Sequence, residues 1–241
     1  MVTKIVNLKI LFINKLCAKF INILKRQEIV FNGKKILENS FPVGSKFTIL
    51  QVGANDGVSF DFLHEIIKTR KTTGVMIEPV PTYFNQLCEN FRDYNDILKI
   101  NKAIHKTKSK ETIYKVKENC LHKYPDWVKG IASFDKDHFK NKVDNDDIET
   151  VSVQCDNLMN IVAEHIKEVD YLQIDTEGYD AEIIKQIDFK KFKPKMIKFE
   201  FVNLNREDYY NTLKLLKSNG YFSFKDGNDV YSLDINRIKL S

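Results

Sequence analysis

A short apolar run that ends in a glycine-rich turn is the strongest constraint in this 241-residue sequence. The run Ile49-Leu50-Gln51-Val52 leads directly into Gly53-Ala54-Asn55-Asp56-Gly57, and the acidic Glu78 follows twenty-one residues after Gly57. A strand, a tight glycine turn and a later carboxylate are typical of folds that bind a ligand containing a nucleoside. The turn lets the backbone approach the ligand, and the carboxylate can accept hydrogen bonds from ribose hydroxyls. This pattern indicates an enzyme.

Apolar segments rich in β-branched residues alternate with segments of helical spacing along the rest of the chain. The expected strands cover 47–52, 74–77, 98–100, 112–116, 150–153, 171–174, 196–201, 221–224 and 229–233. The expected helices cover 59–68, 82–91, 157–168, 180–187 and 207–218. This alternation predicts an α/β domain with a doubly wound, mostly parallel sheet that is covered by helices on both faces.

Glycines, amides and carboxylates follow several of these strands. They are Gly53 to Gly57, Glu78-Pro79, Asn101-Lys102-Ala103 and Asp175-Thr176-Glu177-Gly178, with Glu200 inside the next strand. Ligands of open α/β sheets bind beyond the carboxyl ends of the strands, where these residues are expected. Their order along the chain therefore strengthens the prediction of a binding site at this edge of the sheet.

Composition and charge exclude several classes of protein. Because 43% of the residues are apolar and 12% aromatic, the chain can bury a sizeable core and is not wholly disordered. Cys17, Cys88, Cys120 and Cys155 show no metal-type spacing, which favours reduced thiols and a cytoplasmic location. Six lysine and arginine residues without any acid fall in residues 1–26, so the remainder contributes −1 to the net charge of +5. A nearly neutral body argues against a nucleic-acid partner.

A later lysine-rich stretch is interpreted as a solvated loop around Pro194. Its members are Lys190, Lys191, Lys193, Lys195 and Lys198.

The N-terminal segment, residues 1–45, is expected to be separate from a folded domain at 46–241. Apolar residues at spacings of three and four predict an amphipathic helix over 2–24, followed by a polar hinge around 32–45. The longest apolar run, 10–13, is far shorter than the ~20 residues of a membrane span. Two alternatives stay open for the helix: peripheral contact with the inner face of a membrane, or packing against the body or a second subunit.

A long polar connector, residues 118–147, is expected to act as a lid or substrate loop. It holds Trp127, Ser133, Phe134 and His138, and long connectors with aromatic residues often carry functional side chains.

The turn itself distinguishes between cofactors. A dinucleotide fingerprint that starts at Gly53 needs glycine at positions 55 and 58, but Asn55 and Val58 stand there. Asn tolerates positive φ, so the turn remains possible for a cofactor without a pyrophosphate. S-adenosylmethionine, with an adenosine for Glu78 and an amino-acid tail for the glycine turn, fits better than NAD.

Several ordered motifs extend this pattern over about residues 47–204. They are LQVGANDG, Asp61, IEPVPTYFNQL, NKAI, WVKGIASF, LQIDTEGYDAEI, IDF and IKFEFVNL. In this order and spacing the chain resembles the FkbM family of S-adenosylmethionine-dependent methyltransferases. The resemblance implies a class I methyltransferase with a Rossmann-like fold, acting on a hydroxyl oxygen of a sugar, glycolipid or polyketide-type product. Many family members have Asp at the position of Gln51, so a polar contact behind the turn is expected to differ here.

The resemblance and the strand ends together assign roles. The expected cofactor-binding residues are Gly53, Ala54, Asn55, Asp56, Gly57, Glu78, Asn101, Ala103 and Asp175. Within this set the glycine loop would contact the methionine part, Glu78 the ribose, and residues 101–103 the adenine. Asp56 and Asp61 have an alternative role as caps of the segment that follows.

Methyl transfer to a hydroxyl requires alignment of the acceptor oxygen and removal of its proton. Asp175, Glu177 and His138 are the predicted catalytic residues. Asp175 has a structural alternative, as a cap of the helix near Tyr179. Asp175, Glu177 and Glu200 could also bind a divalent metal, although no histidine cluster supports such a site.

The sequence thus predicts an O-methyltransferase for a small-molecule or glycan acceptor. An NAD-type oxidoreductase and a non-catalytic, membrane-associated or scaffold domain of the same fold are the alternatives.

Overall fold

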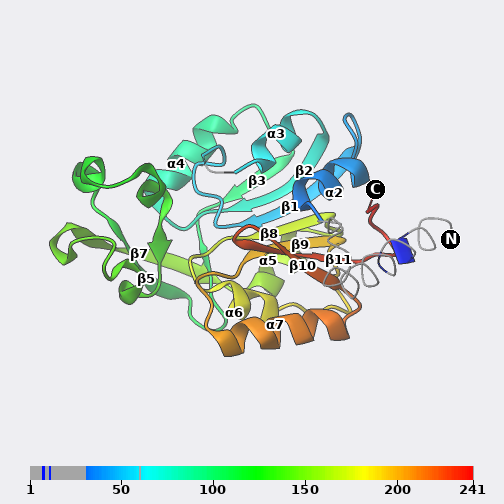
Figure 1. Ribbon diagram of the computed structural model, residues 1–241. Helices are drawn as coiled ribbons and strands as arrows, with labels where there is room; N and C mark the ends of the chain where they lie inside the picture. The colour runs from blue at the N-terminus through cyan, green and yellow to red at the C-terminus, as the bar shows by residue number, and fades with distance from the viewer. Residues whose placement is uncertain (1–6, 9–10, 12–30, 60, 241) are drawn as a thin grey trace, which may run out of the picture.

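A seven-stranded sheet forms the centre of the computed structural model, which describes residues 7–8, 11, 31–59 and 61–240 (Figure 1). The strand order is β10-β11-β9-β8-β1-β2-β3. The strands are β1 (Lys46–Val52), β2 (Lys71–Ile77), β3 (Ile97–Ile100), β8 (Tyr171–Ile174), β9 (Met196–Glu200), β10 (Phe222–Asp226) and β11 (Asp229–Leu233). β11 runs antiparallel to β9 and β10, and the other pairs are parallel. The mostly parallel α/β sheet predicted from the alternation is confirmed.

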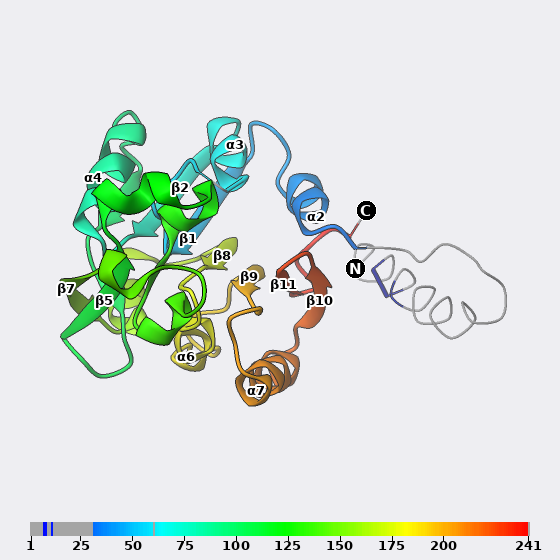
Figure 2. The same cartoon turned by 60° about the vertical axis from the view of Figure 1, so that its left-hand side comes forward.

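Helices cover both faces of this sheet (Figures 1 and 2). One face packs against α2 (Gly33–Ser40), α3 (Leu63–Lys68) and α4 (Pro81–Asn90). The other packs against α5 (Leu158–His165), α6 (Asp180–Lys185) and α7 (Arg206–Ser218). Strand β1 serves both layers, because its alternate residues Phe47 and Ile49 belong to the first core and Leu50 and Val52 to the second.

A small lobe, residues 103–156, stands beyond the carboxyl ends of the central strands (Figure 2). Its strands are β4 (Ala103–Ile104), β5 (Lys110–Val116), β6 (Ala132–Ser133) and β7 (Ile148–Asp156). Four 3₁₀ helices lie between β5 and β7: η1 (Glu118–Lys123), η2 (Asp126–Gly130), η3 (Lys136–Phe139) and η4 (Asn145–Asp147).

The expected connector 118–147 is therefore a folded part of this lobe, with apolar residues buried in its own core. Those residues include Cys120, Val128, Ile131 and Phe139. The carboxylate of Asp147 joins its two ends, accepting hydrogen bonds from the Tyr124 hydroxyl at 2.6 Å and the Lys123 Nζ at 3.0 Å.

The segment predicted as a polar hinge, 32–45, contains helix α2 instead. The Asn32 side chain accepts a hydrogen bond from the Lys35 backbone N–H and begins the helix, while Ile36 and Leu37 are buried against the sheet. A Cβ on Gly33 would lie 2.3 Å from the Tyr231 ring, so this end of α2 packs tightly on β11. The sequence analysis did not predict α2, because the segment is polar in composition and only a few of its positions are buried.

The amphipathic helix predicted over 2–24 falls mostly outside the described residues. Within the described part, Asn7 is buried, and its side-chain amide donates to the carbonyl oxygens of Ile235 at 2.7 Å and Ile238 at 2.6 Å. Across the described ranges, no helix has both the length and the apolar character needed to cross a membrane.

Substitution of Gly57 tests whether the turn after β1, residues 53–57, depends on close packing against Phe91. Its φ is +76°, and a Cβ there would lie 2.5 Å from the Phe91 ring. We expect Gly57→Ala to lower the free energy of unfolding by about 3 kcal/mol, since it adds both backbone strain and overpacking. Gly44→Ala is the matched control, because Gly44 has a φ of +79° but open space around its Cβ position. Urea unfolding should show only about 1 kcal/mol for this control, and equal losses in both variants would contradict the packing argument.

Candidate active site

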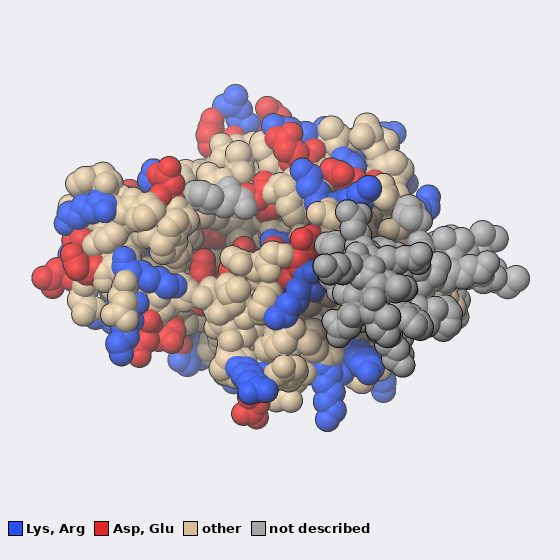
Figure 3. Space-filling model, in the orientation of Figure 1, with Lys and Arg blue, Asp and Glu red and all other residues tan. Residues whose placement is uncertain are grey.

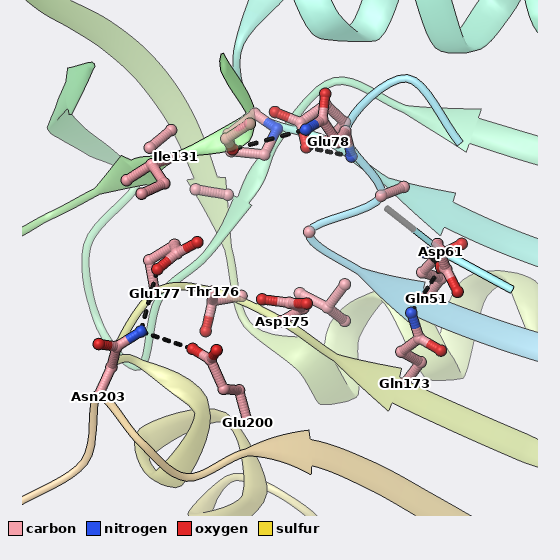
Figure 4. A pocket seen from close by; sticks show the side chains of 18 of the residues that line it. Gln51, Asp61, Glu78, Ile131, Gln173, Asp175, Thr176, Glu177, Glu200 and Asn203 are labelled. Carbon is pink, nitrogen blue, oxygen red and sulfur yellow. Dashed lines mark hydrogen bonds between the residues drawn. The ribbon is translucent and has the colours of Figure 1, made fainter. Parts of the chain in front are cut away.

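A cavity of about 540 Å³ lies between the small lobe and the carboxyl ends of β1, β2, β8 and β9 (Figure 4). The main sheet contributes Gly53, Glu78 and Asp175, while the lobe contributes Trp127 and His138. Figure 3 shows acidic side chains gathered in the hollow at the middle of this face. The cavity thus occupies the position where open α/β sheets bind their ligands.

The glycine turn lies directly on the backbone that follows β8. Gly53 has a φ of +78°, and a Cβ there would come within 1.8 Å of the Asp175 carbonyl oxygen. The backbone N–H groups of Gly53 and Ala54 both donate to the Ile77 carbonyl at 3.0 Å, which attaches the turn to the end of β2. Asn55 also has a positive φ of 50°, as the sequence argument required of this position.

Glu78 lies against this turn and is almost completely buried, with 4% of its surface exposed. Its carboxylate accepts backbone hydrogen bonds from Asn55 at 2.8 Å and from Val80 at 2.8 Å. Burial raises the pKa of Glu78 to about 7, although these two hydrogen bonds act in the opposite direction. A carboxylate at the end of β2 that faces the cavity is suited to bind the hydroxyls of a ribose.

Three residues predicted to contact the cofactor shape the loops instead of lining the cavity. The Asn101 side chain donates to the carbonyls of Glu78 at 2.8 Å and Pro79 at 3.0 Å. The Asp56 carboxylate accepts from the backbone N–H groups of Val58 and Ser59, the capping alternative considered for it. Gly57 packs into the core. Ala54, Asn55 and Ala103, in contrast, do line the cavity.

Three polar side chains lie side by side on the cavity floor, in register across three strands. Gln51 of β1 pairs with Gln173 of β8, and Gln173 pairs with Lys198 of β9. They continue the rows that hold Phe47, Tyr171 and Met196 deeper in the sheet, because residues two apart on a strand share a face. We call Gln51, Gln173, Lys198 and Asp61 the polar floor.

Asp61 joins the polar floor into one network. Its Oδ2 accepts hydrogen bonds from the side-chain amides of Gln51 and Gln173, both at 2.7 Å, and its Oδ1 accepts from the Leu63 backbone N–H at 2.8 Å (Figure 4). Asp61 therefore lines the cavity and also binds the backbone at the start of α3, although the N-cap position of this helix is Phe62. This helix begins at Leu63 rather than Ser59, because Asp56 and Asp61 bind the intervening backbone in turns.

Lys198 was wrongly interpreted as part of a solvated loop. It is buried within β9, lines the cavity, and its Nζ lies 3.1 Å from Asp229 Oδ2. Burial by itself lowers the pKa of Lys198, but Asp229, Asp175 and Asp61 outweigh this effect, and the pKa is raised. Lys198 is thus a buried cation among carboxylates.

The cavity fits S-adenosylmethionine on the evidence of its donors and acceptors. The Gln51 side chain is 2% exposed, and its Oε1 has no hydrogen-bond donor within the described ranges. An orphaned acceptor on the floor, together with the Asp175 carboxylate, suits an α-ammonium group, and Glu78 suits the ribose. The cavity therefore has acceptors suited to both the α-ammonium group and the ribose of the cofactor.

A chain of polar contacts connects His138 of the lobe with Glu200 at the end of β9, and Figure 4 shows its part from Glu177 through Asn203 to Glu200. The Nε2 of His138 lies 3.1 Å from Glu177 Oε2, and the side-chain amide of Asn203 donates to the same Oε2 at 3.0 Å. The Asn203 amide also donates to Glu200 Oε2 at 2.5 Å. Burial and the nearby Glu177 raise the pKa of Glu200 to about 7. The structure therefore brings together His138, Glu177 and Glu200, which lie far apart in the sequence.

Glu177 is held by its backbone as well. Its φ is +53°, a region that non-glycine residues rarely adopt. The Ser133 hydroxyl donates to the Glu177 carbonyl at 3.0 Å, so the lobe fixes this turn directly. Strained non-glycine residues of this kind cluster at functional sites.

Asp175 lines the cavity, and α6 begins at Asp180 with no hydrogen bond from a capping side chain, so Asp175 does not have the capping role that was its alternative. The Asp180 carboxylate accepts from the Thr176 hydroxyl at 2.8 Å and from the Glu200 backbone N–H at 3.1 Å. Burial raises the pKa of Asp175 well above its usual range, and the neighbouring acids Asp180 and Glu200 add to this shift against the effect of Lys198. Asp175 is therefore a partly buried acid at the point where the strand ends.

The described residues contain no group of three or more histidine, cysteine or acidic side chains arranged to bind a metal. Glu177 and Glu200 are joined by the Asn203 amide instead, and amide N–H groups do not bind cations.

Sequence reasoning missed the parts played by Gln173, Lys198 and Asn203. Gln173 and Asn203 stand inside motifs that were recognised, but their side-chain partners come from other strands. For Lys198 the alternation of β9 was a usable signal, since it places Lys198 on the same face as Met196 and Glu200.

The fold and the cavity define a class I Rossmann-like methyltransferase. A model of the methyltransferase FkbM domain matches residues 51–223, which is more than half of the chain. The chain therefore belongs to the FkbM methyltransferase family, and it is an enzyme that uses S-adenosylmethionine as methyl donor. Comparison with curated proteins gave no match.

Solved structures with a similar fold are methyltransferases or related proteins of low sequence identity. Aeropyrum pernix fibrillarin with bound S-adenosyl-L-methionine is 12% identical, with a TM-score of 0.44, over 80% of this chain and 69% of that one. TrmK from M. capricolum, in complex with S-adenosyl-homocysteine, is 12% identical, with a TM-score of 0.41, over 85% and 68%. A Thermotoga maritima SAM-dependent O-methyltransferase is 10% identical, with a TM-score of 0.40, over 89% and 69%.

The raised pKa of Glu78 predicts pH-dependent cofactor binding. Because this pKa is about 7, the carboxyl group protonates as the pH falls through neutrality, and a neutral acid accepts hydroxyl hydrogen bonds less strongly. We expect the affinity for S-adenosylhomocysteine, measured by calorimetry, to rise between about pH 6 and pH 8 as Glu78 ionises.

Two variants test whether Glu78 causes this dependence. Glu78→Gln should bind about 10- to 100-fold more weakly at pH 8 and lose the dependence. Glu200→Gln removes another acid whose pKa is about 7, and it should keep the dependence. A Glu78→Gln protein with the parent's pH profile would refute the assignment.

Proposed function

We propose that this methyltransferase acts on a hydroxyl oxygen of a sugar, glycan or related small-molecule acceptor. The observation that carries the proposal is the pair of His138 and Glu177, joined at 3.1 Å inside the cavity. A hydroxyl is a poor nucleophile while it keeps its proton, so the enzyme needs a base at the acceptor. Transfer to an amine requires less help, because a neutral amine attacks without prior loss of a proton.

The residues of the chain divide into two groups in this mechanism. S-adenosylmethionine, when bound, supplies an electrophilic methyl group. The polar floor and Glu78 hold the donor, while Glu177 and Glu200 receive the acceptor and fix its orientation for in-line attack. The contacts of Glu177 with His138 and Asn203 both use Oε2. This leaves Oε1, to which no described residue donates, for the acceptor hydroxyl.

The proton of the hydroxyl enters the pair of His138 and Glu177. Glu177 Oε1 takes this proton, and His138 donates its Nε2–H to Glu177 Oε2 and so holds the carboxylate in position for the transfer. Ser133 and Asn203 are positioning residues in this scheme, because they hold the Glu177 backbone and carboxylate respectively. Asp175 lines the cavity at the strand end, and a cationic donor bound there would favour the ionised form of its carboxyl group.

The alternatives receive less support from the site. Family membership argues against an NAD-type oxidoreductase. A non-catalytic scaffold has no need for a strained Glu177 or for a histidine held against it, since such features cost stability without adding to the core. A nucleic-acid acceptor is disfavoured by a cavity that six carboxylates and three lysines line among the described residues.

The acceptor class is tested first by a transfer screen. The purified protein and radiolabelled S-adenosylmethionine are incubated with neutral glycosides, nucleotide sugars, polyketide-type alcohols and matched amines. Transfer to hydroxyl compounds supports the proposal. Transfer confined to the amines would overturn it.

Variants of the base pair are expected to separate catalysis from cofactor binding. Glu177→Gln and His138→Asn should each lower kcat by about 100-fold or more, because each removes a member of the proton-accepting pair. Their affinity for S-adenosylhomocysteine should stay within about twofold of the parent, since neither residue belongs to the polar floor. Lys129→Gln, an exposed change in the same lobe, is the matched control and should leave both quantities unchanged. Full activity in Glu177→Gln and His138→Asn would remove the pair from the mechanism.

A further inference from the structure

Trp127 is a large apolar side chain left half exposed at the cavity. It lies on η2, lines the cavity, and has 49% of its surface accessible. Its neighbour Val128 is buried in the core of the lobe, and the Gly130 carbonyl faces the Asn55 side-chain amide at 3.5 Å. The segment that carries Trp127 is therefore anchored on both sides, while the indole itself remains free of the core.

A second exposed apolar residue belongs to the same cavity. Val202 follows β9, lines the cavity, and is 48% exposed. It is next to Asn203, whose amide joins Glu177 and Glu200. Ligand pockets typically combine apolar or aromatic side chains with a small number of polar groups. The cavity therefore combines two exposed apolar side chains with several carboxylate oxygens.

This combination matches the chemistry of one kind of ligand. A pyranose ring has an apolar face of C–H groups and a rim of hydroxyls, so it can stack on an indole while donating hydrogen bonds to carboxylates. A phosphorylated sugar would bring its negative charge close to Asp175, Glu177 and Glu200. Of the three lysines that line the cavity among the described residues, Lys198 is paired with Asp229 and Lys102 with Asp156, and the Nζ of Lys142 lies 3.4 Å from His138 Nε2. They are outnumbered by the carboxylates of the lining.

We propose that Trp127 is a stacking platform for an uncharged sugar ring, and that Glu177 and Glu200 exclude phosphorylated acceptors. This inference rests on the proposed function and names its substrate class more narrowly. Trp127 stacks on the sugar ring, and the carboxylates repel acceptors that carry a negative charge. Trp127 is thus a specificity-determining residue that takes no part in the proton transfer.

Ligand binding at Trp127 can be measured directly by fluorescence, because Trp127 is the only tryptophan in the sequence. Tryptophan fluorescence of the protein, saturated with S-adenosylhomocysteine, therefore reports on this position alone. The probes are methyl glucoside, methyl galactoside and methyl mannoside, each compared with the 6-phosphate of the same hexose. We expect a saturable fluorescence change with at least one neutral glycoside, and binding at least about 10-fold weaker for its phosphate.

Variants test whether Trp127, the source of the fluorescence signal, also contributes to the affinity for glycosides. Trp127→Ala should weaken glycoside binding by about 10-fold, measured by ligand-observed NMR, since loss of a stacked ring removes about 1 to 2 kcal/mol. Glu200→Gln should reduce the discrimination against the phosphate. Tyr210→Ala is the matched control, because Tyr210 is an equally exposed aromatic residue on α7 that does not line the cavity. It should leave glycoside binding unchanged.

Several results would overturn the inference. They are no saturable response to any neutral glycoside, unchanged affinity in Trp127→Ala, or phosphates that bind as tightly as the neutral sugars. The failure of the proposed function is distinguishable from these outcomes. If hydroxyl compounds other than sugars are methylated and Trp127→Ala keeps their KM, the inference fails and the proposed function stands. If Trp127 reports sugar binding but only amines are methylated, the proposed function fails instead.

Discussion

The close approach of Gly53 to the Asp175 carbonyl is the contact on which the rest of the site depends. A side chain at position 53 would collide with this backbone, so the turn after β1 can lie on the end of β8 only because the residue is glycine. The same turn donates two backbone N–H groups to Ile77 and one to Glu78. Because Gly53 has no Cβ, the turn after β1 can contact the ends of both β2 and β8. The ends of these three strands therefore border the same cavity.

The polar floor shows what surrounds Gln51, the position where the family resemblance led us to expect a different polar contact. The amide of Gln51 reaches Asp61, which also accepts from Gln173, so a carboxylate remains at the floor although it comes from the start of α3. The Gln51 amide contributes an N–H donor to this network, and its own oxygen is buried without a hydrogen-bond donor among the described residues. The floor therefore keeps one carboxylate, with Lys198 and its partner Asp229 beside it.

Burying so many acids has an energetic cost that the fold itself does not require. The pKa values of Glu78 and Glu200 are raised to about 7, and that of Asp175 is also raised, chiefly because burial disfavours their charged forms. Perturbed acids concentrated in one cavity are typical of functional sites. A cationic methyl donor would lower this cost when it binds, which is a physical reason for an acid-rich cavity in a methyltransferase.

The sequence was a good guide wherever the information was local. The alternation of strands and helices, the turn at Gly53 and the carboxylates at strand ends depend on neighbouring residues, and the structure has them at or near the predicted positions. Prediction failed where partners come from distant segments. Lys198 looks solvated until its β9 neighbours are known, and Asn101 looks like a ligand contact until its amide is seen to hold the backbone of Glu78 and Pro79. The helix α2 was missed because its apolar stripe is only a few residues long.

The small lobe contacts both halves of the cavity at strained residues. Its Gly130 carbonyl faces the side chain of Asn55, and its Ser133 hydroxyl binds the carbonyl of Glu177. Asn55 and Glu177 are two of the non-glycine residues with positive φ in the described chain, one on the side proposed for the donor and one on the side proposed for the acceptor. Such conformations persist only where surrounding contacts fix them. The lobe that carries His138 and Trp127 therefore also holds the two turns against which donor and acceptor must be aligned, so the geometry of both is set by a single packed unit.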